Sequence, residues 1–140
     1  MKLRMLVAVA VLVSGAVHLR LWADGVRDIE VIGPLFLLNA VAAVAIAVAA
    51  LLWRSWVPLL LAAGFGASTL GAFVISATVG LFGVHERWTG GYVIIANVAE
   101  LVALAGGSWA LYAEGWAVQA RSHLPHRQPG SARRNGHRAT

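Results

Sequence analysis

The sequence predicts an all-α fold, a four-helix transmembrane bundle with up-down-up-down order. Of its residues, 59% are hydrophobic and only 12% are charged, whereas soluble domains carry about a quarter charged residues. Four apolar segments each approach or exceed the roughly 20 residues that cross a bilayer core. These segments are continuous and lack the alternation of a membrane β-barrel, so helices are the expected spanning elements.

The helices are predicted at about 5–22, 31–53, 57–82 and 91–112. Pro34 and Pro58 lie near the start of a segment, where a missing backbone N–H is tolerated. Aromatic residues fall at the predicted ends, as expected for the two membrane interfaces: Trp22, Trp53, Trp56, Trp88, Tyr92 and Tyr112. The connections are short, so consecutive helices should be antiparallel neighbours in one membrane domain, residues 1–116.

The first segment has a second interpretation. Residues 1–16 combine a charged start, a short apolar run and small residues, which is the pattern of a cleaved signal peptide. Apolarity continues to Trp22, however, and the remainder would still hold three membrane helices. We therefore expect the first helix to be retained, with cleavage as the alternative.

The distribution of Lys and Arg predicts the orientation. Three fall on one side of the predicted bundle, namely Arg20, Arg27 and Arg87. Eight fall on the other side: Lys2, Arg4, Arg54, Arg121, Arg127, Arg133, Arg134 and Arg138. By the positive-inside rule, both termini should be cytoplasmic in a multi-pass protein of the plasma membrane.

Residues 117–140 form a basic segment with almost no large apolar residues, so we expect a disordered cytoplasmic tail. Its charge should attract anionic lipid at the bilayer surface. Nucleic acid is not an expected partner, because no aromatic residue or binding motif accompanies the charge.

Polar side chains within the apolar segments gather in one layer. With a rise of about 1.5 Å per residue, Glu100 lies roughly 12 Å, and Asn97 roughly 8 Å, below the outer boundary that Tyr92 marks. Similar counting places the other members in the outer half, so the polar-layer candidates are His18, Asn39, Ser76, Asn97 and Glu100. The inner half is nearly devoid of polar side chains, which disfavours a channel or carrier.

Two interpretations of this layer stay open. A carboxylate in hydrocarbon is unfavourable by about 2.5 to 3.5 kcal/mol, so Glu100 should face the bundle interior. We expect it to hydrogen-bond His18, with Asn39 and Asn97 completing a network that fixes the helices in register. Alternatively, the layer is the floor of an outward-facing pocket for a small amphipathic or lipid-derived ligand. The candidate outer rim of that pocket comprises Arg20, Arg27, His85, Glu86 and Trp88.

The sequence identifies no cofactor and no catalytic residue. It contains no cysteine, which excludes disulfides, thiolate metal sites and dithiol chemistry. A haem would find only His18 within a predicted span. A metal site from His18, His85, Glu86 and Glu100 would need three separate elements to converge. Ser14 and His18 have the spacing of a nucleophile and base on one helix, but no oxyanion-hole motif accompanies them.

The stretches VSGAVHLRLWADGVRDIEVIGPLFLLNAVAAV (13–44) and LLLAAGFGASTLGAFVISATVGLFGVHE (59–86) resemble small four-helix integral membrane proteins of actinobacteria that have no assigned function. More loosely, they resemble DoxX-type four-helix proteins. The resemblance covers about residues 5–115, implies the topology and carries over no functional residue. We expect a non-enzymatic small subunit or ligand-binding module, acting with a second copy or a membrane partner subunit. The alternative is a membrane enzyme or redox accessory acting on a lipid, isoprenoid or quinone-like molecule.

Overall fold

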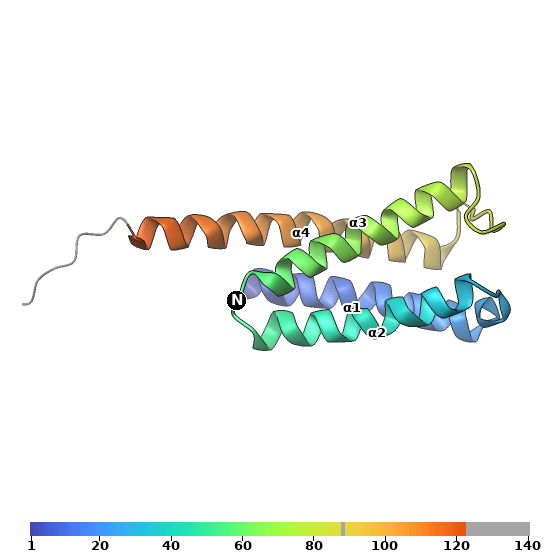
Figure 1. Ribbon diagram of the computed structural model, residues 1–140, viewed down its shortest axis with the longest axis horizontal. Coiled ribbons are helices and arrows are strands. Elements are labelled where there is room, and N and C mark those ends of the chain that lie inside the picture. Colours follow the sequence, from blue (N-terminus) through green and yellow to red (C-terminus); the bar gives the residue numbers. More distant parts are fainter. Residues whose placement is uncertain (88, 123–140) are drawn as a thin grey trace, which may run out of the picture.

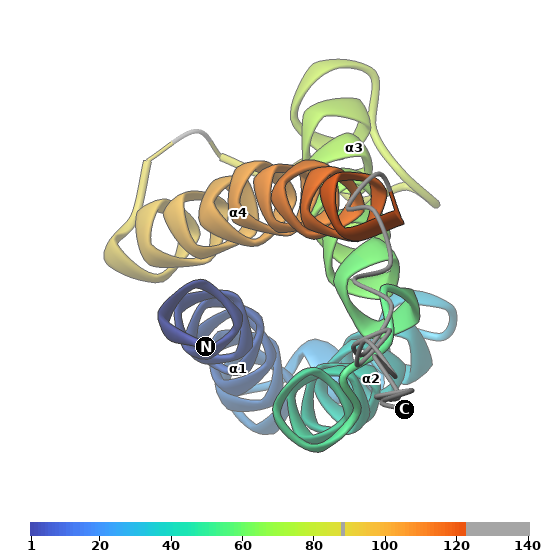
Figure 2. The ribbon, with the colours of Figure 1, turned by 90° about the vertical axis from the view of Figure 1, so that its left-hand side faces the viewer.

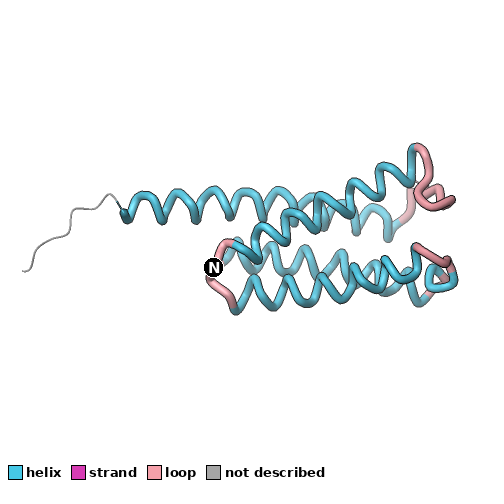
Figure 3. Tube along the Cα trace, in the orientation of Figure 1, coloured by secondary structure: helices cyan, strands magenta, loops and turns pink. Residues whose placement is uncertain are grey.

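The structure, a computed structural model, describes residues 1–87 and 89–122, with side chains described up to Gly115. It contains α1 (Lys2–Ala23), the short 3-10 helix η1 (Val26–Asp28), α2 (Ile32–Leu52), α3 (Val57–Thr78) and α4 (Gly91–Ser122). The four α-helices are long and apolar enough to cross a membrane, and the described residues contain no strand (Figures 1 and 3). The predicted fold class, an all-α four-helix bundle, is therefore confirmed.

α1 begins at Lys2, three residues before its predicted start, and two helix ends differ more from the prediction. α3 stops at Thr78 rather than at residue 82, because Gly80 adopts a φ of +86° and donates its N–H to the carbonyl of Ile75. α4 continues beyond Tyr112 to Ser122, because the added residues are mainly helix formers and include no proline. Residues 117–122, predicted as tail, are thus helical, and residues 123–140 lie outside the described part of the chain.

The helices are not packed evenly around the bundle. α1 packs against α2 and α4, and α3 packs mainly against α4. α2 and α3 are consecutive, yet they contact each other little because α3 diverges from α2 along its length (Figures 1 and 2). The N-terminus and the α2–α3 connection lie at one end of the bundle, here the Arg4 end (Figure 1). η1 and the α3–α4 connection lie at the other, here the cavity end (Figure 1).

Small residues bring the helix backbones together. A Cβ on Gly15 of α1 would clash with Ala43 of α2, and one on Gly66 of α3 would lie 2.5 Å from the carbonyl oxygen of Glu100 in α4. A Cβ on Gly107 of α4 would lie 3.0 Å from the carbonyl oxygen of Leu59. Such contacts suit a bilayer, where lipid is as apolar as leucine and helices associate through close backbone approach.

Large apolar side chains cover the outer surface. Leu38, Val41 and Leu52 of α2 are each at least 60% exposed, while the residues between the helices are mostly alanine, valine and glycine. This inside-out distribution is what lipid contact permits and water would oppose.

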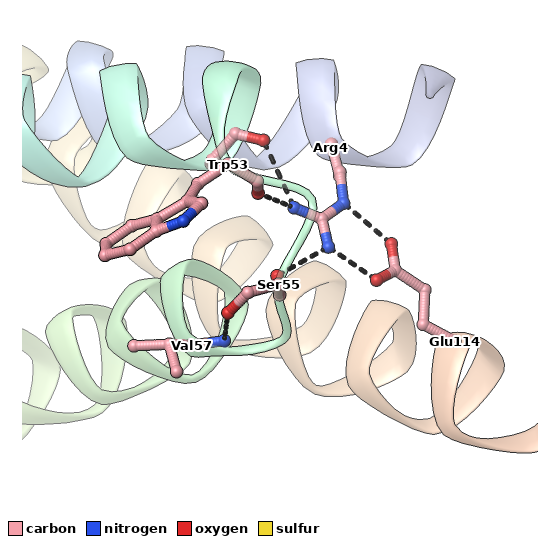
Figure 4. Close-up of polar contacts among 6 residues, drawn as sticks. Arg4, Trp53, Ser55, Val57 and Glu114 are labelled. Atoms are coloured by element: carbon pink, nitrogen blue, oxygen red, sulfur yellow. Dashed lines mark hydrogen bonds and ion pairs between the residues drawn. The ribbon is translucent and has the colours of Figure 1, made fainter. Parts of the chain in front are cut away.

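One buried arginine joins three segments at the Arg4 end (Figure 4). The Arg4 guanidinium forms a two-pronged ion pair with Glu114 of α4, with Nε 2.7 Å from Oε1 and Nη2 against Oε2. Nη1 donates to the carbonyls of Ala50 (3.3 Å) and Trp53 (2.7 Å), and Nη2 also donates to that of Ser55 (2.7 Å). All five N–H groups of the guanidinium are therefore engaged, and carbonyls that the end of α2 leaves without helical partners are satisfied.

Replacing Arg4 with alanine should lower the free energy of unfolding by about 3 kcal/mol, because it leaves a carboxylate and helix-end carbonyls without their donor. Arg4→Lys should recover less than half of that loss, since an ammonium lacks the planar fork. The measurement is unfolding in mixed dodecyl maltoside and dodecyl sulfate micelles. The matched control is Lys2→Ala, an exposed cation on the same helix end. Equal stability of the Arg4→Ala and Lys2→Ala proteins would contradict the assignment.

Gly66 and Gly64 provide a second comparison on one helix. A Cβ at Gly66 would lie 2.5 Å from the carbonyl oxygen of Glu100 and 2.8 Å from the backbone nitrogen of Leu104, whereas one at Gly64 would meet nothing within 4 Å. Gly66→Ala should destabilise the protein by about 1 to 3 kcal/mol because backbone atoms must separate. Gly64→Ala should be neutral, or stabilise by up to about 1 kcal/mol. The same micelle assay decides, and a loss of stability in both variants would refute this packing.

Candidate functional site

A cavity of about 350 Å³ lies among the four helices toward the cavity end. Its lining comes from the end of α1, the first part of α2, the second half of α3, the α3–α4 connection and the first part of α4. Apolar side chains such as Leu35, Phe36, Phe65 and Phe73 form most of the wall. The structure brings all five polar-layer candidates to this cavity: His18, Asn39, Ser76, Asn97 and Glu100.

Glu100 is the most deeply buried ionisable side chain of this lining, with 2% of its surface exposed. Its Oε1 accepts a hydrogen bond of 2.9 Å from the Ser14 hydroxyl of α1, and the Thr69 hydroxyl of α3 is a second polar neighbour. The expected hydrogen bond to His18 is not formed, because His18 Nε2 lies 4.0 Å from Oε1, beyond hydrogen-bond range. The Ser14 hydroxyl donates to Glu100 instead, because the short serine side chain fits between two helices in close contact.

His18 is held by its own helix and by an aromatic neighbour. Its Nδ1 lies 2.9 Å from the backbone carbonyl oxygen of Ser14, so the Nδ1–H donates to that oxygen. The imidazole packs against the Phe36 ring, with 4.8 Å between ring centroids. Because the Ser14 hydroxyl bonds Glu100 rather than the imidazole, Ser14 and His18 are not arranged as a nucleophile and its base.

Three further hydroxyls of the cavity lining donate to backbone carbonyls. Ser68 and Thr69 donate to the carbonyl of Phe65, at 3.0 and 2.7 Å. Ser76 donates to the carbonyl of Val84 at 2.9 Å and so ties the α3–α4 connection to α3. The Oδ1 of Asn39 is buried and has no hydrogen-bond partner among the described residues.

A tight turn covers part of the cavity. Leu81 and Val84 exchange two backbone hydrogen bonds, of 2.8 and 2.9 Å, across Phe82 and Gly83. Both central residues have positive φ, 49° and 81°, as in a type I′ turn. The side chains of Leu81 and Val84 line the cavity, whereas Phe82 is 63% exposed.

The predicted outer rim is only partly assembled around the cavity. Glu86 lines it. Arg20 and Arg27 are more than half exposed and pair with Asp24 (3.0 Å) and Asp28 (3.8 Å) outside it. The His85 ring packs directly against Gly80 instead, and Trp88 lies outside the described residues.

Ser14, Ser68 and Thr69 had no predicted place in the polar layer. Thr69 lies near the middle of α3, too deep for the layer that counting from the interface defines. A signal existed for Ser14, because it stands one helical turn before His18 and therefore on the same helix face.

In the part of the chain that the structure describes, no group of three or more His, Asp or Glu side chains lies close enough together to hold a metal ion. Comparison of the chain with protein-family models, curated proteins and solved structures gave no match in any of the three.

A double-mutant cycle of Ser14→Ala and Glu100→Leu should give a coupling energy of about 0.6 kcal/mol and at most about 1.7 kcal/mol, the mean and the maximum for hydrogen bonds between membrane helices. Unfolding in mixed micelles supplies the four stabilities. Ser14→Ala paired with Val98→Ala is the matched control, because Val98 is 54% exposed on the outer surface of α4. Purely additive effects in the Ser14 and Glu100 pair would show that their bond stabilises nothing.

Proposed function

We propose that this chain is a multi-pass protein of the plasma membrane that binds a small amphipathic ligand in the cavity, with the cavity in the outer half of the bilayer. The observation that carries the proposal is a space of about 350 Å³ with mostly apolar walls and a polar floor at Glu100. Ligand sites have this construction, in which apolar walls supply contact area and a few polar groups fix orientation.

A purely structural role accounts less well for these polar groups. A register-fixing network should pair its members with one another and leave little space among them. Here the direct side-chain hydrogen bond to Glu100 comes from Ser14, Asn39 Oδ1 has no partner among the described residues, and both Asn39 and Asn97 line open volume. The polar atoms are therefore better placed to meet a ligand than to meet each other.

The orientation rests on charge. Arg20, Arg27 and Arg87 are the basic residues near the cavity end, whereas most Lys and Arg residues of the sequence fall at or beyond the opposite helix ends. By the positive-inside rule, the cavity end then faces outward and both termini are cytoplasmic. A ligand would enter from the outer leaflet or from the outer solution.

Binding is favoured over catalysis. An enzyme or redox accessory acting on an isoprenoid or quinone-like molecule would use the same cavity. Among the described residues, the serine and histidine pair with suitable spacing, Ser14 and His18, offers no activated hydroxyl in this arrangement. A ligand-binding module, working alone or as a small subunit beside a partner, needs only the cavity and its polar groups. An enzyme would need catalytic groups in addition.

The chain has no cysteine, so single-cysteine variants can test the cavity and its orientation together. Asn97→Cys places a thiol in the cavity lining, and Val98→Cys places one on the lipid-facing surface next to it. A membrane-impermeant cationic methanethiosulfonate added outside intact cells should modify Asn97→Cys at least about tenfold faster, because thiolates react only where water reaches them.

Added instead to inside-out vesicles, the reagent should lose this selectivity. Equal rates for the two variants from outside would contradict an accessible cavity. Faster modification of Asn97→Cys from the cytoplasmic side would reverse the orientation.

A further inference from the structure

The charged groups that line the cavity have a one-sided composition. Two are acids, Glu100 of α4 and Glu86 of the α3–α4 connection. The third side chain that can carry a charge is the imidazole of His18 in α1. No Lys or Arg of the described residues lines the cavity, and Arg20 and Arg27 pair with their own neighbouring acids. A carboxylate or phosphate head would therefore enter a low-dielectric space without a fixed cation to offset its charge.

Several oxygen acceptors line the cavity as well. The hydroxyls of Thr69 and Ser76 already donate to oxygens of the protein, so they present mainly lone pairs to a ligand. The buried Oδ1 of Asn39 is an acceptor with no partner among the described residues. An ionised Glu100 accepts only. Besides the amide N–H groups of Asn39 and Asn97, the lining thus offers hydroxyl, amide and carboxylate oxygens as acceptors, and a head that carries several N–H groups can donate to them.

Aromatic side chains surround this floor. Phe36 of α2, Phe65 and Phe73 of α3 and Tyr92 of α4 all line the cavity. Aromatic faces attract a cation through their quadrupole, most strongly in a desolvated site. The same rings supply apolar contact for a hydrocarbon body, so one lining serves both parts of an amphipathic cation.

We propose that the ligand is a lipophilic primary amine bound in its protonated form, with its ammonium group at the Glu100 carboxylate and its hydrocarbon chain against Phe36, Phe65 and Phe73. This inference rests on the proposed function and adds the chemical class of the ligand to it. Glu100 is the counter-ion, Asn39 Oδ1 is a further acceptor for the ammonium, and Glu86 favours entry of a cation through the mouth.

Three probes with one hydrocarbon chain and different heads test the ligand class: decylammonium, decanol and decanoate. The full chain is placed in phosphatidylcholine nanodiscs, and calorimetric titration is corrected with empty nanodiscs. Decylammonium should bind at least about tenfold more tightly than decanol, because a charge-assisted hydrogen bond in a buried site is stronger than a neutral one. Decanoate should show no binding above the empty nanodiscs.

Variants then assign the effect to the cavity and to Glu100. Glu100→Gln keeps the shape and removes the charge, so it should lower decylammonium affinity about tenfold and change decanol affinity by less than about twofold. Glu30→Gln is the matched control, because Glu30 is an exposed acid near the same end of the bundle that does not line the cavity, and it should leave decylammonium affinity unchanged. Ala72→Phe fills the cavity and should abolish probe binding, whereas Val74→Phe, at a position 46% exposed on the same helix, should not.

The outcomes separate the two proposals. If decanol or decanoate binds as tightly as decylammonium, or if Glu100→Gln leaves decylammonium affinity unchanged, the ligand class is wrong while the binding function stands. If no probe shows binding that Ala72→Phe removes, the proposed function itself fails. The head-group comparison uses the unaltered protein, so it decides the ligand class even if a Glu100 variant does not fold.

Discussion

The rest of the bundle depends on the guanidinium of Arg4. Its five N–H groups connect the first turn of α1 to the end of α2, to the α2–α3 connection and to Glu114 of α4. A fork that binds backbone carbonyls and a carboxylate at once fixes direction as well as distance, which a point charge would not. With one end of the helices secured in this way, α3 can diverge from α2 toward the other end without separating from the bundle.

Because α3 diverges from α2, the polar groups are arranged differently at the two ends of the bundle. At the Arg4 end, the buried guanidinium of Arg4 is satisfied by the partly exposed Glu114 carboxylate and by backbone carbonyls, as a buried charge must be. At the cavity end, hydroxyls are satisfied by backbone carbonyls, but the carboxylate of Glu100 and the amides of Asn39 and Asn97 line open volume. A bundle of this size has few polar side chains in its spans, and their concentration around one space is the strongest reason to seek a ligand there.

The fold class and most of the polar residues of the cavity lining follow from sequence alone, for a definite reason. Hydropathy identifies four spanning segments, and the fixed rise of a helix gives the depth of each residue, which placed His18, Asn39, Ser76, Asn97 and Glu100 at similar levels. Depth does not determine helix rotation. It therefore could not predict that Ser14 rather than His18 bonds Glu100, or that Arg20 lies outside the cavity. The pair of Arg4 and Glu114 is separated by 110 residues, and only their positions just outside the same ends of the first and last predicted spans hinted at it.

Glu100 stands at the point where close packing gives way to the cavity. Its carbonyl oxygen would lie 2.5 Å from a Cβ on Gly66, so α3 and α4 touch at this level, and the contact continues toward the Arg4 end through Gly107 and Leu59. On the opposite side, Ser14 bonds the carboxyl and is followed by Gly15, where α1 meets α2. The backbone of Glu100 is therefore held by close helix contacts while its side chain lines the open volume. A binding group carried on such a rigid support is preorganised, which reduces the ordering that a ligand would otherwise have to impose.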